Sequence, residues 1–452
     1  MKTNSTLQLK LKRGLDLPLK GEALEKLPAV APSAVSICPD DFPGITPKLD
    51  VKEGDEVAIG TPLMHDKEYP QIVLASPAKG VVKEVVRGSR RKIERVVVTP
   101  QGDIDWNEDA PDKDTVSKMS REEAVDALCR SGLWSWMRQL PYAIVPRPDA
   151  VPRDIFVAGF DSAPLATGFD GSSITAKNIQ AGINYLARLT DGKIYISKRP
   201  SQAQLSVTGA VWVEISGPHP AGNPDVMVNH IAPVNKGETV WTLDIDTLDK
   251  IGYWARTGSG ASLTSVAITG PEAVNRGVVR TLVGADMHTL LGGHIADDGK
   301  HHRIVAGNVL TGVRTDIDGY LHFPYRQVTV IAEGDDKDEM LGWASLSPNK
   351  MSASRTFLSA YMPKRKLGGD ALLHGGRRAM IMSGVYDRML PMDIMLEPLV
   401  KAILSRNIEE MEALGIYEIA PEDVAVAEWA DPSKLELQKI VREGLDYMRR
   451  EA

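Results

Sequence analysis

The 452-residue sequence predicts a multi-domain α/β protein, because of its length, its composition and the changes of hydrophobic pattern along the chain. Domains usually contain about 100–200 residues, so this length corresponds to roughly three or four of them. A hydrophobic share of 43% and a charged share of 25% are typical of globular protein, so each unit can bury a core. We expect a β-rich region over 1–110, an α/β domain over 111–258, a small β-rich domain over 259–335 and a helical domain over 336–452.

The first region carries the signals of a β-sandwich, since residues 45–98 alternate short β-branched runs with Gly and Pro turns. The pattern V-x-x-G-D-x-V-x-x-G-x-P-L at 51–63, followed by A-x-P-x-x-G-x-V at 75–82, resembles the barrel-sandwich hybrid of lipoyl and biotinyl carrier domains. Those carriers are modified on a hairpin lysine. Lys67 occupies a similar turn, but a longer stretch containing Pro70 follows it. We prefer a structural use of this fold, and an acyl-carrier protein modified on Lys67 is an alternative.

The α/β domain is predicted from a helix followed by buried strands. Residues 121–140 carry apolar side chains at helical spacing, and Pro141 then breaks the chain. Three strand-like runs follow at 154–159, 192–197 and 210–217, with a helical run between the first two. This order favours a doubly wound, Rossmann-like domain.

The second half of the chain changes from strand signals to helix signals. Strand-like runs at 265–270, 277–284 and 326–331 fit a small β-grasp fold of the SLBB-like kind. After Pro348 the sequence becomes rich in Met, Leu and Glu. We expect the last hundred residues to be chiefly helical, with helical periodicity over 391–406, 407–414 and 433–450.

Charge and hydropathy exclude several classes of partner. Fifty-three basic and sixty acidic side chains leave a net charge of −7, so nucleic acid is not an expected partner. The densest basic run, 87–92, predicts a solvated hairpin turn, with a lipid or subunit contact as the alternative. The N-terminus has no signal-peptide pattern, and charges interrupt the most apolar stretch, 379–404. We expect a cytoplasmic protein that reaches a membrane only through partner proteins.

Motifs for bound cofactors and for catalysis are missing from the sequence. The stretch 158–168 has Asp161 and bulky residues where a dinucleotide loop needs glycines. His288, His294, His301 and His302 lack metal-ligand spacing and are expected in a solvated loop, and two cysteines cannot hold an iron–sulfur cluster alone. We predict no catalytic, cofactor-binding or metal-binding residue. The loop 217–224 follows a strand where an α/β sheet binds its ligand, and a rigid structural loop is the alternative.

Several segments, taken in order, resemble the A-subunit family of the Na+-translocating NADH:quinone oxidoreductase (Na+-NQR). The residues that carry the resemblance are 13–18, Gly21, 51–57, 87–88, 131–134, 217–222 and 233–242. The resemblance implies a peripheral subunit on the cytoplasmic face of the bacterial inner membrane, with integral membrane subunits as partners. It also implies that NADH, the flavins and the iron–sulfur centre are bound by other subunits, and that the isolated chain is not catalytic. A free-standing flavoprotein NADH dehydrogenase is the competing hypothesis.

The resemblance extends to the helical tail and to a quinone site. Val424, Ala427 and Asp431 stand where a ferredoxin-type module of a related complex has cysteines, so the tail resembles such a module without its ligands. The family's quinone-contacting segments carry over onto 38–45 and 137–143, with ubiquinone or menaquinone as the ligand. The predicted contacts are Asp40, Phe42, Pro43, Gly44, Met137, Arg138, Pro141 and Tyr142. The aromatic rings can face a quinone and Arg138 can donate to its carbonyl oxygens, whereas packing at a domain junction is the alternative.

Overall fold

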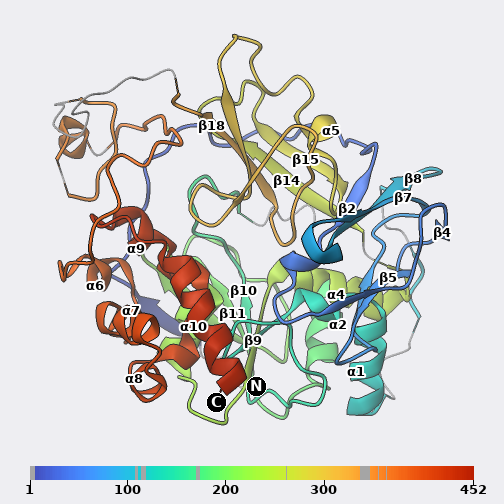
Figure 1. The fold of residues 1–452 in the computed structure, drawn as a ribbon. Coiled ribbons are helices and arrows are strands. Elements are labelled where there is room, and N and C mark those ends of the chain that lie inside the picture. Colours follow the sequence, from blue (N-terminus) through green and yellow to red (C-terminus); the bar gives the residue numbers. More distant parts are fainter. Residues whose placement is uncertain are drawn as a thin grey trace.

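The computed structural model describes residues 6–451 except 107–109, 114–118, 169–173, 261, 336–346, 355 and 363. These residues form four sheets and a group of helices near the C-terminus (Figure 1). Among them, no helix combines the length and the apolar character needed to cross a membrane.

The predicted β-sandwich is present near the N-terminus and consists of two sheets. Their inner faces share a core that includes Leu63, Leu74, Val82 and Val96, because alternate residues of each strand point inward. The basic run predicted as a hairpin turn joins the two longest strands, with Arg90 and Arg91 exposed. One sheet has the order β2 (Val35–Ile37), β8 (Ile93–Pro100), β7 (Gly80–Arg87), β4 (Glu56–Val57), and the other β3 (Pro47–Leu49), β5 (Pro62–Asp66), β6 (Val73–Ala75).

A six-stranded sheet forms the centre of the molecule (Figure 1). It is parallel except for its last strand. Its order is β1 (Leu7–Lys10), β12 (Val211–Ser216), β11 (Ile194–Lys198), β10 (Ile155–Ala158), β13 (Val240–Asp244), β9 (Arg138–Leu140). The edge strand β1 comes from the region predicted to belong to the sandwich.

Both faces of this sheet are covered, which explains its continuous apolar strands. Ile155 and Val157 of β10 point to the core shared with α2 (Ala176–Leu186) and α4 (Ile245–Thr257). Phe156, between them, points to the opposite core, which contains α3 (Pro224–Ile231) and the C-terminal helices.

The helix predicted over 121–140 is shorter than expected. Helix α1 (Arg121–Arg130) starts with a capping box between Ser120 and Glu123 and ends at Arg130. Gly132 then adopts a φ of +82°, which L side chains rarely reach, and the chain turns away from the helix axis. A short 3₁₀ turn (Trp134–Trp136) leads into β9, so the second half of the predicted helix is a turn and a sheet edge.

The third unit is a five-stranded mixed sheet, in agreement with the predicted β-grasp type. Two neighbouring inner strands are parallel to each other, although the chain between them forms the other strands and a short helix, α5 (Met287–Leu291). The order is β15 (Gly277–Leu282), β14 (Leu263–Thr269), β18 (Gln327–Ala332), β16 (His302–Ala306), β17 (Val313–Thr315).

The C-terminal part is less helical than predicted. Between Ser347 and Gly384 the described residues form turns and one 3₁₀ turn (Leu358–Tyr361), because glycine pairs such as Gly368-Gly369 interrupt this stretch. The helices follow as α6 (Val385–Met389), α7 (Leu396–Ser405), α8 (Ile408–Ala413), α9 (Ala425–Ala430) and α10 (Leu437–Glu451).

The three positions compared with cluster cysteines are all buried in this helical part. Val424 and Ala427 belong to its apolar core. The Asp431 carboxylate accepts backbone N–H bonds from Ser433 and Leu435, so it caps the start of the following turn.

Candidate functional site

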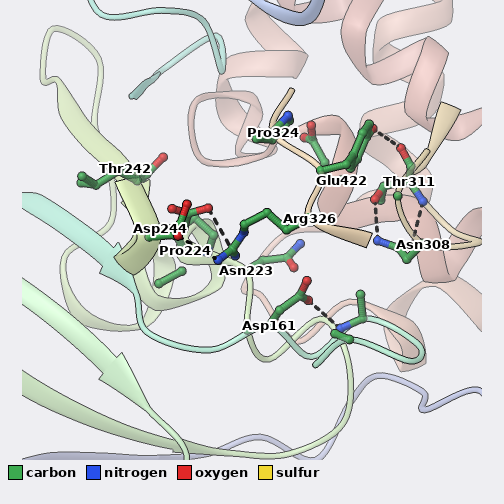
Figure 2. A pocket seen from close by; sticks show the side chains of 18 of the residues that line it. Asp161, Asn223, Pro224, Thr242, Asp244, Asn308, Thr311, Pro324, Arg326 and Glu422 are labelled. Atoms are coloured by element: carbon green, nitrogen blue, oxygen red, sulfur yellow. Dashed lines mark hydrogen bonds and ion pairs between the residues drawn. The ribbon is translucent and has the colours of Figure 1, made fainter. Parts of the chain in front are cut away.

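A cavity of about 480 Å³ lies at the carboxyl ends of β10 and β13. After β10 the chain continues to β11, which pairs with one side of β10, whereas β13 pairs with the other side. The loops that follow β10 and β13 therefore diverge and leave a crevice between them. Figure 2 shows Arg326 between Glu422 and Asp161, with its guanidinium extending toward Asp244. Pro43, Thr311 and Arg442 also line the cavity, so all four predicted units contribute to one site.

One wall of the cavity is aromatic. Phe323 lines it and stacks on Phe42 with ring centroids 5.0 Å apart, and Trp136 lies 4.8 Å from Phe323. The guanidinium of Arg138 lies 5.8 Å from the Phe323 centroid. Such a wall offers a flat apolar surface with a cation at its edge, which suits a planar ring.

Arg138 belongs to the edge strand β9 and is held rigidly. Its guanidinium donates to the backbone carbonyls of Ser135, Met137 and Asp41 at 3.1, 3.3 and 2.9 Å. Burial lowers the pKa of Arg138, but a guanidinium remains charged in proteins. The cavity therefore contains a fixed positive charge.

The loop after β12 brings a buried histidine to the cavity. His219 precedes a cis peptide bond to Pro220 and lines the cavity with Gly222. Its Nδ1 bonds Ser162 Oγ at 2.9 Å, and that oxygen accepts the N–H of Gly222 at 2.8 Å. Nε2 of His219 has no partner among the described residues. Burial lowers the pKa of His219, so the imidazole is neutral at pH 7.

A pair of buried carboxyl groups lies beside this loop. Asp225, in the first turn of α3, lines the cavity, and its Oδ1 has no partner within the described part of the chain. Asp423 accepts from Asn223 Nδ2 at 2.8 Å and from the Ala420 N–H at 2.9 Å. Burial raises the pKa of Asp423 to about 7. Burial and the nearby Asp423 and Glu422 raise the pKa of Asp225 well above its usual range, which favours its neutral, protonated form.

Only some of the eight predicted quinone contacts line the cavity. Pro43 and Arg138 line the cavity, and Phe42 supports its wall from behind. Tyr142 adopts a φ of +85° and presents its backbone carbonyl to Arg442 at 2.5 Å, while Asp40 is exposed and pairs with Lys92. The others, outside the lining, are Gly44 beside Ile144, the fully buried Met137 and Pro141, whose peptide bond is cis.

Several cavity residues were not predicted. Asp225, Glu422 and Arg442 carry no local motif, and they lie outside the predicted quinone segments and outside the constrained loop 217–224. Of the histidines expected in a solvated loop, His301 is exposed and pairs with Asp335 at 2.6 Å, whereas the expectation is wrong for His302, which begins strand β16 with its side chain buried.

Together, these features define a multi-domain α/β protein in which a sandwich, an α/β sheet, a β-grasp sheet and a helical tail enclose one ligand-sized cavity. Three family descriptions match the sequence: the NqrA N-terminal barrel-sandwich hybrid domain over 9–101, the NqrA second alpha/beta domain over 119–260 and the NQRA C-terminal domain over 265–316. The chain belongs to the NqrA family, the A subunits of the Na(+)-translocating NADH-quinone reductase.

Curated relatives match over almost the full length. The A subunit from Rhodopirellula baltica is 34% identical over 459 residues, which cover 98% of each protein. The A subunit from Klebsiella pneumoniae is 33% identical, covering 98% of this chain and 100% of the relative. Among solved structures, an NAD+-reducing NiFe hydrogenase covers 50% of each chain at 10% identity and a TM-score of 0.35, which is too low to bear on function. The full-length matches give no support to the flavoprotein or acyl-carrier alternatives.

Proposed function

We propose that this chain serves as a peripheral subunit of a membrane-bound complex that couples NADH oxidation and quinone reduction to Na+ export, on the cytoplasmic face of the membrane. The relatives are named as the A subunits of such a reductase. Integral membrane subunits are the proposed partners, and NADH, flavins and the iron–sulfur centre are assigned to those other subunits. The isolated chain then binds quinone without being a complete enzyme.

The cavity is the proposed binding place for the quinone head group. The observation that carries this proposal is one cavity of about 480 Å³ that is lined both by Phe323, which Phe42 supports from behind, and by the polar side chains of Arg138 and Asp225. A quinone ring is planar and apolar on its faces and has two carbonyl oxygens that accept hydrogen bonds. The protonated Asp225 and the fixed Arg138 can supply donors, and the volume lies within the usual range of ligand pockets.

The finer description of the fold supports the same location. In the order β12-β11-β10-β13 the chain starts in the middle and reverses direction once, as in Rossmann-like sheets, which bind ligands at the reversal. We place domain boundaries near residues 110, 258 and 335, and regard the helices after Gly384 as the remnant of a ferredoxin-type module.

The direct test is equilibrium binding of a soluble short-chain ubiquinone to the purified full-length chain. Phe323→Ala removes the aromatic wall, and Asp225→Ala removes the neutral donor; each should weaken binding roughly 10-fold or more. Asp225→Asn keeps a donor at the same position and should restore most of the affinity.

Two further variants separate the cavity from other sites. Tyr142→Ala changes a predicted contact outside the cavity lining. A large loss of quinone affinity in this variant, with no loss in Phe323→Ala, would indicate that quinone binds at segment 137–143 and not in the cavity. Tyr361→Ala removes an exposed aromatic ring, 74% accessible, and is the control for loss of a ring in general. Unchanged affinity in every cavity variant would refute the proposal.

A further inference from the structure

A second group of chemically reactive side chains lies behind the aromatic wall, outside the cavity. Cys38, Asp41 and His322 each offer one potential ligand atom, and these atoms all lie within 4.8 Å of one another. Cys38 and Asp41 belong to the sandwich unit, whereas His322 belongs to the β-grasp unit. We infer that Cys38, Asp41 and His322 form a binding site for a divalent thiophilic cation, of which Zn2+ is the best match.

The local backbone explains why Cys38 and Asp41 face the same point. Cys38 precedes a 3₁₀ turn, η1 (Pro39–Asp41), and the Asp41 N–H donates to the Cys38 carbonyl at 3.2 Å. Side chains three residues apart lie on one side of a 3₁₀ turn. The thiol and the carboxylate are thus brought together by sequence-local structure.

His322 is positioned by contacts on both sides of it. The Leu321 N–H donates to the Ala285 carbonyl at 2.9 Å, and Phe323 stacks on Phe42. The Phe323 N–H donates to Asp41 Oδ2 at 2.9 Å, which leaves Oδ1 directed at His322 Nδ1, 2.8 Å away. A hydrogen bond to the second carboxylate oxygen is the usual way in which a protein orients a metal-ligating carboxylate.

The ligand types and distances fit zinc. Zinc binds thiolate sulfur at about 2.3 Å and imidazole nitrogen or carboxylate oxygen at about 2.0–2.2 Å, so two ligand atoms of a tetrahedral site lie about 3.3–3.8 Å apart. The three atoms already lie within 4.8 Å of one another, so small side-chain rotations bring them to this spacing. A thiolate and a carboxylate balance the charge of a divalent ion. All three residues are partly exposed, so an ion and a water molecule as fourth ligand can enter.

The neighbouring cations do not occupy this position. Lys92 pairs with Asp40 at 2.5 Å, and Arg138 donates to the Asp41 backbone carbonyl and not to its side chain. Without metal, the contact between Asp41 and His322 joins the two units directly at this point. A bound ion would replace that pair by a three-ligand cross-link next to the Phe42–Phe323 stack.

Cobalt is the most informative probe, because Co2+ replaces Zn2+ in tetrahedral sites and absorbs light. Titration of the full-length chain with Co2+ at pH 8 should give one equivalent of tetrahedral absorption and a thiolate charge-transfer band, both abolished by excess Zn2+. The chain has two cysteines, and Cys129 is fully buried, so the charge-transfer band reports Cys38. Cys38→Ser should abolish it, and Cys129→Ser should retain it.

A second measurement covers variants that fold poorly. Zn2+ should raise the melting temperature of the wild type relative to EDTA, and Cys38→Ser or His322→Gln should lose at least tenfold in Zn2+ affinity and show no such rise. His301→Gln, at an exposed histidine that pairs with Asp335, is the matched control and should respond as the wild type does. Absence of the charge-transfer band, its retention in Cys38→Ser, or equal Zn2+ responses in wild type and His322→Gln would overturn the inference in favour of a metal-free ion pair.

Discussion

The buried carboxyl group of Asp423 makes the stability of the protein depend on pH in a direction opposite to that of an aspartate whose pKa is lowered by folding. Asp423 is 1% exposed, and burial raises its pKa from 3.8 to about 7. Its contribution to stability is fully present below pH 3.8 and is lost as pH rises through 7, because the unfolded chain releases the proton at lower pH. We therefore predict that the wild type becomes less stable between pH 4 and pH 8.

The size of this effect follows from the two pKa values. A tenfold change in proton affinity corresponds to about 1.4 kcal/mol, so the rise from 3.8 to about 7 corresponds to roughly 4 kcal/mol. Asp423→Asn removes the titration and keeps the shape of the side chain. The amide of Asn223, which donates to Asp423 at 2.8 Å, can rotate to present its oxygen to the new amide.

The measurement is the denaturant midpoint of the full-length chain in steps from pH 5 to pH 8. The wild-type midpoint should fall across this range, and the midpoint of Asp423→Asn should fall clearly less. Asp318→Asn, on an exposed turn, is the control and should follow the wild type. Equal slopes for wild type and Asp423→Asn would refute the assignment of a neutral carboxyl group beside the cavity.

Two further predictions concern the scaffold. Gly252→Ala should cost about 2 kcal/mol or more despite the higher helix propensity of alanine, because its Cβ would lie 1.8 Å from the Asn178 carbonyl oxygen in the facing helix. In the matched control Gly444→Ala the nearest atoms belong to the Ile403 side chain, at 2.9 Å, and not to the backbone, so its urea midpoint should fall less. Asp286→Ala should cost about 2–4 kcal/mol, since the carboxylate accepts N–H bonds from Ser33, Ala34 and Thr289. Burial alone would raise the pKa of Asp286, but these bonds lower it, so the loss in thermal stability should become smaller as pH falls below 3.8 and Asp286 takes up a proton. A wild-type melting temperature in Asp286→Ala at pH 7 would contradict this account.

Local sequence signals predicted most of the strands. Where a prediction was wrong, the cause is a contact that the local sequence does not contain. The continuous apolar run of Ile155, Phe156 and Val157 is a property of the strand itself, so it indicated a strand covered on both faces without knowledge of its neighbours. The helix expected over 121–140 ended early because Gly132 takes a positive φ where a Cβ would lie 2.5 Å from Ala75 of the sandwich. That contact joins residues far apart in sequence, and the apolar spacing alone does not contain it.

The cavity was harder to predict than the sheet that positions it. The loop 217–224 was readable as a ligand loop, because its glycines and prolines follow a strand of an α/β sheet. Burial shifts the pKa values of Asp225, Asp423 and Arg442, and this burial arises only when distant segments of the chain pack together. The same holds for His322, which looks like an isolated histidine until the fold places it beside Cys38 and Asp41.

The N-terminal segment explains how four units can share one rigid cavity. After β1 completes the central sheet, the Gly14 N–H donates to Arg388 of the helical tail, and Leu19 bridges to Leu367. Gly21 and Gly270 then pass so closely that a Cβ at Gly21 would lie 2.2 Å from the Gly270 oxygen, which fixes this segment against the β-grasp sheet. One extended segment therefore ties the α/β, helical and β-grasp units together before the sandwich begins. Because each wall of the cavity belongs to a different unit, an excised α/β domain should keep the strands β9–β13 of its sheet and lose both β1 and the binding site.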